Sequence, residues 1–254
     1  MSKEVVSVQL EWKYSPNSYL EESKSIPFAG GQLEIENGVA KTEVDSKLYY
    51  EEPSILDYLT KLIESELVAV QLETHNKFKL TKAGRTEIRA DGSKNIFVEV
   101  EPMVLKLSMG TADIVIRDKN DNIVSDTRSD RIDKKNTVSA LLVKHWESDS
   151  TLDRMLKSYQ NAVEDAEDEF VHLYEIRDAL SRRFQSQKTA ISELKIANSD
   201  WKNLGKLANS LPLSQGRHRG NAEGPLREAN SAELKEARDS AVNLIHKYLE
   251  YLEN

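Results

Sequence analysis

The stretch Gln32-Leu-Glu-Ile-Glu-Asn37-Gly38-Val-Ala-Lys-Thr-Glu-Val44 decides how the first half of the chain folds. Apolar and polar residues alternate on both sides of Asn37-Gly38, and this alternation is the period of a half-buried β-strand. Asn-Gly accepts the positive φ angles that a type I′ turn requires. Residues 32–44 therefore predict a β-hairpin.

An alternating segment precedes this hairpin and a helical pattern follows it. From Val5 to Tyr14 apolar residues recur at every second position and Pro16 ends the pattern, so we expect a strand there. After Pro53 the apolar residues fall on one face of a helix, which is expected to cover one face of a sheet. These residues are Ile55, Leu56, Leu59, Leu62 and Ile63.

The rest of the first half predicts further strands. They are expected at residues 67–73, 77–80, 85–89, 95–101 and 103–109, and residues 113–117 and 122–126 predict a second hairpin. His75 lies between two of these strands, where a loop histidine is usually solvated. Trp12, Tyr14 and Tyr19 are expected to pack in the sheet core or at its rim, with an aromatic recognition face as the alternative.

The character of the sequence changes near residue 136. Residues 118–136 are dominated by Asp, Lys, Arg and Asn, which is typical of a domain boundary. We therefore divide the chain into a β-rich domain, residues 1–135, and a helical domain, residues 136–254. Residues 138–146 are interpreted as a short strand or helix that crosses between the two domains.

The second half has the 3.6-residue period of amphipathic helices. One helix of about 30 residues is expected from Thr151 onward, with shorter helices at residues 188–196 and from Asp200. Asn230 and Glu233 have the spacing of a capping box before a last helix. The predicted fold class is α+β, with an amino-terminal, mostly antiparallel β domain that contains one helix, followed by an all-α helical bundle.

The loop of residues 209–224 interrupts the helices and is the candidate functional site. Gly216 and Gly220 flank an Arg-His-Arg triplet, so we expect positive φ angles and a backbone that approaches a ligand closely. Two guanidinium groups and an imidazole supply hydrogen-bond donors there. The candidate catalytic residues are Arg217, His218 and Arg219, and the candidate ligand-binding residues are Asn209, Lys206, Glu175 and His172.

These residue types suit chemistry on RNA. A histidine can move the proton of a ribose 2′-hydroxyl, and an arginine can stabilise the phosphate charge. Residues 202–228 carry five basic and two acidic residues, which predicts a local positive patch. Glu175 is the expected ion-pair partner of Arg217, and with Asp168 and His172 it forms an acid–base or metal cluster or a salt-bridge network. The structural alternative is a loop whose Arg217 and His218 bond helix-end carbonyls or a buried acid of the long helix.

The helical region from Leu152 to Leu252 resembles the HEPN superfamily of helical nucleotide-binding and ribonuclease domains. The resemblance rests on the order of the helices, on an Asn followed by Arg-His, and on a final helix rich in Ala, Leu and Tyr. It implies ligand binding or RNA cleavage at paired motifs of a homodimer, in prokaryotic defence or stress response. In the nuclease members an Arg precedes the His by four to six residues, whereas Arg217 and His218 are adjacent.

Two functions follow from these observations. The first is a HEPN-like binding or assembly protein that engages RNA, a nucleotide or a protein partner. In that case the β domain recognises the partner, and the long helix dimerises through Tyr159, Val163 and Phe170. The alternative is a metal-independent endoribonuclease that uses Arg217 and His218. The altered spacing of the motif favours the binding or assembly role.

The composition limits the other possibilities. A formal net charge of -8 argues against a protein that coats nucleic acid by bulk electrostatics. The chain has no cysteine and no phosphate-loop, dinucleotide or His-Glu-x-x-His motif, so we predict no cofactor and no metal. The amino terminus lacks the pattern of a secretory signal, and no apolar run approaches about 20 residues. We therefore expect a cytoplasmic protein without membrane association.

Overall fold

The computed structural model describes residues 4–97, 113–221 and 224–254. The chain forms two compact units: a sheet unit of Met1–Val70 and Phe78–Asn136, and a helical unit of Gln71–Lys77 and Thr137–Asn254. The predicted division lay after residue 135, and the sequence did not indicate that residues 71–77 belong with the helices. An antiparallel sheet is followed by helices, so the predicted α+β class is confirmed.

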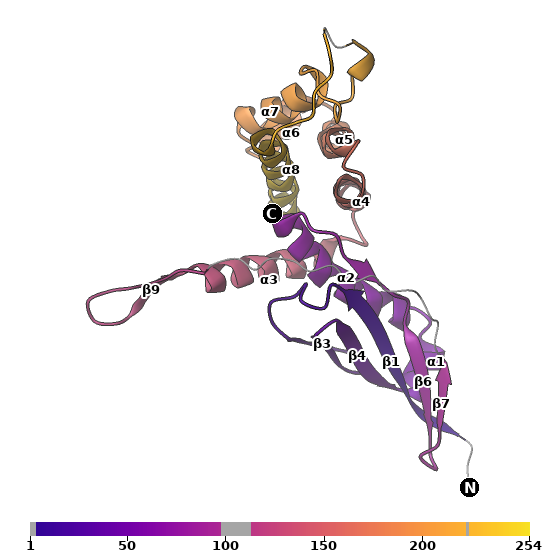
Figure 1. The fold of residues 1–254 in the computed structure, drawn as a ribbon. Coiled ribbons are helices and arrows are strands. Elements are labelled where there is room, and N and C mark those ends of the chain that lie inside the picture. The colour runs from indigo at the N-terminus through magenta and orange to yellow at the C-terminus, as the bar shows by residue number, and fades with distance from the viewer. Residues whose placement is uncertain (1–3, 98–112, 222–223) are drawn as a thin grey trace. The chain divides into compact units, whose positions relative to one another are not determined.

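A seven-stranded antiparallel sheet forms one layer of the sheet unit (Figure 1). Its strands are β1 (Val5–Ser15), β2 (Lys24–Phe28), β3 (Gly31–Glu36), β4 (Val39–Asp45), β5 (Lys79–Leu80), β6 (Gly84–Arg89) and β7 (Lys94–Phe97). Their order is β2-β3-β4-β1-β6-β7, and β5 pairs with β1. The central strand β1 therefore lies between β4 and β6.

The hairpin predicted around Asn37-Gly38 is confirmed as β3 and β4. Glu36 pairs with Val39 across the turn, and Asn37 and Gly38 have φ angles of 49° and 87°. The strands predicted at residues 5–14, 77–80 and 85–89 correspond to β1, β5 and β6. Part of the predicted strand 95–101 is β7, whereas its last residues and the whole of 103–109 lie outside the described residues.

One face of this sheet is covered by α2 (Ile55–Thr74), which follows the short helix α1 (Ser46–Glu51) (Figure 1). Alternate β1 side chains are buried on this face, and they share one core with Leu59 and Ile63 of α2. Trp12 belongs to this core, and its Nε1 donates to Thr60 Oγ1 at 3.1 Å. Tyr14 and Tyr19 are buried as well, so the aromatic residues pack in the core as expected.

The strand predicted at residues 67–73 is wrong, because α2 continues to Thr74. Leu67, Val68, Val70 and Leu72 are all buried. An apolar run that is buried on every side lacks the one-sided pattern of a surface helix, so a run rich in Leu and Val resembles a central strand.

The second predicted hairpin is confirmed as β8 (Val115–Arg117) and β9 (Ile123–Asp126), which form a separate two-stranded sheet. It leads directly into α3 (Thr127–His145), so residues 138–146 are largely helical. The Asp126 carboxylate accepts hydrogen bonds from the backbone N–H groups of Arg128 and Ser129 (3.0 and 3.2 Å) and caps this helix.

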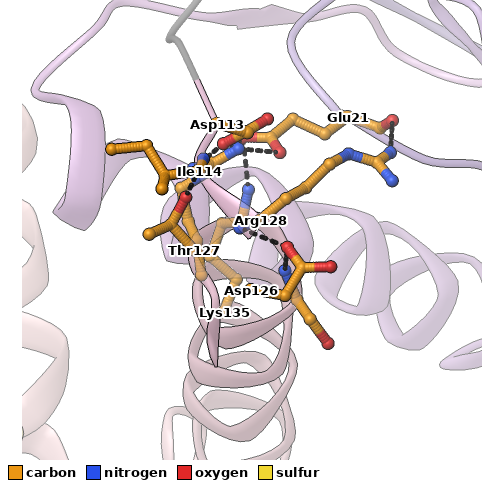
Figure 2. Close-up of polar contacts among 9 residues, drawn as sticks. Glu21, Asp113, Ile114, Asp126, Thr127, Arg128 and Lys135 are labelled. Carbon is orange, nitrogen blue, oxygen red and sulfur yellow. Dashed lines mark hydrogen bonds and ion pairs between the residues drawn. The ribbon is translucent and has the colours of Figure 1, made fainter. Parts of the chain in front are cut away.

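A charged network at the start of α3 fixes it to the loop after β1 (Figure 2). The Glu21 carboxylate accepts hydrogen bonds from Arg131 Nε and from Lys135 Nζ, each at 2.9 Å. Arg131 Nη1 also donates to Asp113 at 2.8 Å, at the base of the β8–β9 hairpin. The hydrogen bonds from Arg131 lower the pKa of Glu21 from its ordinary 4.5 to about 2.

The helical unit contains α4 (Ser150–Glu164), α5 (Glu169–Arg183), α6 (Gln187–Glu193), α7 (Asn198–Asn209) and α8 (Ser231–Leu252). The single long helix predicted from Thr151 is two helices, because the chain turns at residues 165–168. There the Asp165 carboxylate accepts from the backbone N–H groups of Glu167 and Asp168 at 3.2 Å each. The predicted capping box is confirmed, with Asn230 and Glu233 each bonding the other's backbone N–H.

The core of the helical unit centres on α5, which contacts α4, α7 and α8. Tyr159, Val163 and Phe170 are buried within this core. They were the expected dimer contacts, and that expectation is wrong for these three side chains, because the fold of a single chain already covers them.

Candidate functional site

The predicted loop folds back onto the end of α7. Arg217 N donates to Ala208 O at 2.7 Å, and Gly216 N donates to Leu213 O at 3.0 Å. A Cβ at Gly216 would lie 3.1 Å from Ala208 O, so a side chain here would crowd the end of α7. Neither Gly216 nor Gly220 has a positive φ angle, so the positive φ angles predicted for these two glycines are wrong.

The two arginines of the triplet point to different places on α5. Arg217 Nη1 lies 3.3 Å from Asp178, and its guanidinium lies 4.2 Å from the centre of the Tyr174 ring. Arg219 forms an ion pair with Asp168. Asp168 and Asp178 are ten residues apart in the sequence, hence about 15 Å apart along the helix. The two guanidinium groups therefore do not converge on one phosphate.

His218, between these arginines, is exposed. Lys206 is also exposed, whereas Asn209 is half-buried and its Oδ1 has no hydrogen-bond donor among the described residues. Arg227 binds the Glu233 carboxylate through two nitrogens at 2.6 and 2.8 Å. Each arginine of the predicted positive patch thus has an acidic partner that lies outside residues 202–228, so counting charges in that window overestimated the local positive charge.

Glu175 does not pair with Arg217, so this expected ion pair is wrong. Glu175 accepts a hydrogen bond from Ser158 Oγ at 3.0 Å and lies 3.8 Å from His172 Nδ1. His172 Nε2 lies 3.6 Å from Asp165. In the described ranges no group of three or more His, Asp or Glu side chains could hold a metal ion, and the contacts of His172 and Glu175 are those of a salt-bridge network.

A buried charged cluster lies at the start of α5, and the sequence pattern did not reveal it. The Glu169 carboxylate accepts hydrogen bonds from Arg238 Nε and Nη2 at 2.6 and 2.8 Å. His75 Nε2 lies 3.4 Å from Glu169, and His75 Nδ1 lies 3.1 Å from Tyr159 Oη. We expected His75 to be a solvated loop histidine, but it belongs to this cluster.

The pKa of Glu169 reports the balance of forces in that cluster. Burial raises it, but the hydrogen bonds from Arg238 and His75 outweigh burial, so the pKa lies below its usual value. The carboxylate is thus charged and satisfied by its neighbours. The cluster connects the end of α2 to α5 and α8, so we interpret it as part of the packing of the helical unit.

The sheet unit carries a second candidate site, a groove of about 670 Å³ on the face of the sheet that α2 does not cover. We call it the sheet groove. One row of side chains crosses it from strand to strand, since Glu34 pairs with Lys41, Lys41 with Glu11, and Glu11 with Gly84. Its lining consists of Gln9, Leu10, Glu11, Lys13, Gln32, Glu34, Lys41, Thr42, Glu43, Thr81, Lys82, Gly84, Arg85, Thr86, Ile96 and Phe97.

Gly84 leaves this row without a side chain in the middle of a sheet. Its φ angle is not in the left-handed region, so the backbone does not require glycine. A Cβ at this position would lie 3.5 Å from Glu11 O, which is an ordinary contact distance. Gly84 is the first residue of β6 and pairs with Glu11 of the central strand. A glycine in a sheet can mark a place where a ligand or another backbone approaches closely.

The polar groups around Gly84 are arranged by hydrogen bonds within the sheet. The Glu43 carboxylate accepts from Ser7 Oγ at 2.6 Å and from Gln9 Nε2 at 2.9 Å, and these bonds lower its pKa. Ser25 Oγ donates to Glu34 at 2.6 Å. The sequence pattern did not reveal this site, because Gly84 precedes the strand predicted at residues 85–89 and the row across the strands depends on their register.

Comparison with models of known families, with curated proteins and with solved structures gives no match. Among the helices of the described ranges, none combines the length and the hydropathy needed to cross a membrane.

Proposed function

We propose that this protein is a binding or assembly protein and that the sheet groove holds an extended segment of a protein partner. The observation that carries this proposal is Gly84, the first residue of β6, which leaves the position beside Glu11 without a side chain although its backbone conformation does not require glycine. The groove also falls within the range of about 300–1,000 Å³ that is typical of ligand pockets.

The charges of the groove favour a peptide over a nucleic acid. Basic and acidic side chains alternate across the sheet, as in the row of Glu34, Lys41 and Glu11. Without a clear excess of positive charge, the groove offers little attraction for a phosphate backbone. An extended peptide presents amide groups and side chains of both signs, and it matches the amide, hydroxyl and charged groups of the lining.

The HEPN resemblance adds an RNA or a nucleotide as a candidate ligand of the loop around Arg217, and prokaryotic defence or stress response as a context. Endoribonuclease activity by Arg217 and His218 stays the alternative prediction. The divergence of Arg217 and Arg219 toward Asp178 and Asp168 supports a binding role over cleavage. A cytoplasmic location fits a chain without cysteine.

A peptide selection tests the groove. Random peptides selected on the wild-type protein would be titrated by calorimetry against Gly84→Leu and Gly220→Leu. Both positions accept a Cβ atom, which meets only ordinary contacts at Gly84 and nothing within 4 Å at Gly220. We expect Gly84→Leu to weaken peptide binding by about ten-fold or more, which corresponds to about 1.4 kcal/mol, and Gly220→Leu to leave it unchanged.

The reverse ranking of these two variants would place the ligand site in the loop and contradict the groove. The absence of any selected peptide would contradict it as well. Incubation with mixed RNA, with and without divalent metal, addresses the alternative function. Cleavage that disappears in an Arg217→Ala/His218→Ala variant with an unchanged melting temperature would make this protein an endoribonuclease.

A further inference from the structure

The β8–β9 hairpin exposes an unusual number of apolar side chains. Each of them is between 48% and 66% accessible: Ile114, Val115, Ile116, Ile123 and Val124. In Figure 1 the hairpin lies beyond the amino-terminal end of α3, apart from the seven-stranded sheet of its own unit. Large apolar side chains gathered on one exposed hairpin are typical of an interaction surface.

The backbone of β8 directs its hydrogen-bonding groups alternately to its two sides. Ile114 N donates to Thr127 Oγ1 at 2.9 Å, and Thr127 N donates to Ile114 O at 3.1 Å. Asp118 N donates to Asn122 O at 2.9 Å. Ile114 and Asp118 therefore face β9, and by alternation the N–H and C=O groups of Val115 and Arg117 face the outer edge. No strand of the described ranges pairs with that edge.

We propose that the outer edge of β8 pairs with the same edge of a second copy of this chain, antiparallel, around a two-fold axis at Val115. The two copies of β8 then form the centre of a four-stranded sheet. Val115 pairs with the partner's Val115, and Asp113 lies opposite the partner's Arg117. Ile114 lies opposite the partner's Ile116, so four isoleucines form one apolar cluster on one face.

The charges of the strand select this register. Asp113 and Arg117 are equally distant from Val115 in the sequence, so a two-fold axis there creates two ion pairs between the copies. An axis at Arg117 would instead place two arginines opposite each other. Asp113 already accepts from Arg131, and Arg117 lies 3.4 Å from Asp121, so the pairs between copies extend existing networks.

This pairing accounts for the homodimer that the sequence predicted, but it assigns the interface to the hairpin and not to Tyr159, Val163 and Phe170. It is independent of the sheet groove, whose residues take no part in it. Isologous pairing of identical strand edges is a common way to close an exposed edge.

Cysteine cross-linking tests the two-fold axis directly, because the wild-type chain contains no cysteine. Residues opposite each other across the axis have Cα atoms about 5.5 Å apart, within the range that a disulfide spans. We expect Val115→Cys to form a covalent dimer under mild oxidation. Val124→Cys, on the other strand and more exposed than Val115 (66% against 48%), is the control and should stay monomeric on a denaturing gel.

A charge reversal provides the second test. Light scattering should show a dimer for the wild type and a shift to monomer for Arg117→Asp, because the new carboxylate lies opposite the partner's Asp113. Lys119→Asp changes the net charge by the same amount as Arg117→Asp, but it lies in the turn of the hairpin, so this variant should remain dimeric. A wild-type protein that is monomeric at all concentrations would overturn the proposal. So would equal cross-linking at Val115→Cys and Val124→Cys, or a dimer that survives Arg117→Asp.

Discussion

Asp168 and Glu169 are neighbours in the sequence, both lie at the start of α5, and both bind an arginine from a distant part of the chain. Arg219 reaches Asp168 and Arg238 reaches Glu169. Their surroundings differ, since the Asp168 side chain is 40% exposed and the Glu169 side chain is 2% exposed. Adjacent helical positions point about 100° apart, so one acid faces the loop and water while the other faces α8 and the end of α2.

The energy of an acid–arginine contact therefore depends on its burial. An exposed pair typically stabilises a protein by about 0–1 kcal/mol, because water and salt screen the charges. Removing one partner of a buried pair costs about 3–5 kcal/mol, because an uncompensated charge remains inside. Glu21, which is 28% exposed, lies between the two extremes. Burial should therefore rank the three carboxylates in the order Glu169, Glu21, Asp168.

The largest effect is expected at the buried pair. Arg238→Ala should lower the free energy of unfolding by about 3–5 kcal/mol, because Glu169 keeps only His75 as a charged partner. Urea denaturation followed by circular dichroism measures this loss. A loss of unfolding free energy below about 1 kcal/mol would mean that water reaches the cluster. The buried pair of Arg238 and Glu169 would then stabilise the protein no more than the exposed pair of Arg219 and Asp168.

An intermediate effect is expected for Glu21, and it should depend on pH. Its pKa is about 2 in the folded protein and 4.5 ordinarily, so folding favours the ionised form. The resulting stability is fully present above pH 4.5 and is lost as the pH falls toward 2. Glu21→Gln should therefore flatten the loss of stability over this interval by about 1–3 kcal/mol, after allowance for solvent screening.

Unfolding by urea at pH 5 and at pH 3, for the wild type and for Glu21→Gln, measures that difference. A variant that loses as much stability as the wild type between the two pH values would show that the network with Arg131 and Lys135 does not stabilise the sheet unit. Glu21 would then resemble Asp168 and not Glu169.

The smallest effect is expected at the loop. Arg219→Ala should change the free energy of unfolding by less than about 1 kcal/mol, because its pair with Asp168 is exposed. The same urea denaturation applies, with Arg238→Ala as the comparison. A loss as large as that of Arg238→Ala would show that the loop is an essential part of the helical core.

Local patterns predicted several elements correctly. The turn at Asn37-Gly38 and the capping box at Asn230 and Glu233 depend on residues within a few positions of each other, so their sequences suffice. The break between α4 and α5 could not be predicted in this way. The apolar period continues through residues 165–168, and only the bonds of the Asp165 carboxylate to the following backbone end the helix.

The candidate loop illustrates the same limit for function. The Arg-His-Arg triplet was recognisable, but the direction of each arginine depends on Asp168 and Asp178, far from the loop in the sequence. Glu175 has the same charge as Asp178 and lies less than one turn before it on α5, yet Arg217 pairs with Asp178. A choice between such neighbours depends on how the loop is packed against the helix.

The α+β class, the hairpins, the helix that covers the sheet and the capping box could all be predicted from the sequence, because alternation, helical spacing and turn residues act over short distances. Three features could be seen only in the folded chain: the burial of Glu169 with Arg238, the contact of His75 with Glu169, and the row across the sheet groove. That row consists of Glu34, Lys41, Glu11 and Gly84. These features depend on strand register and helix packing. Register and packing arise from contacts between residues far apart in the chain, and no local pattern encodes them.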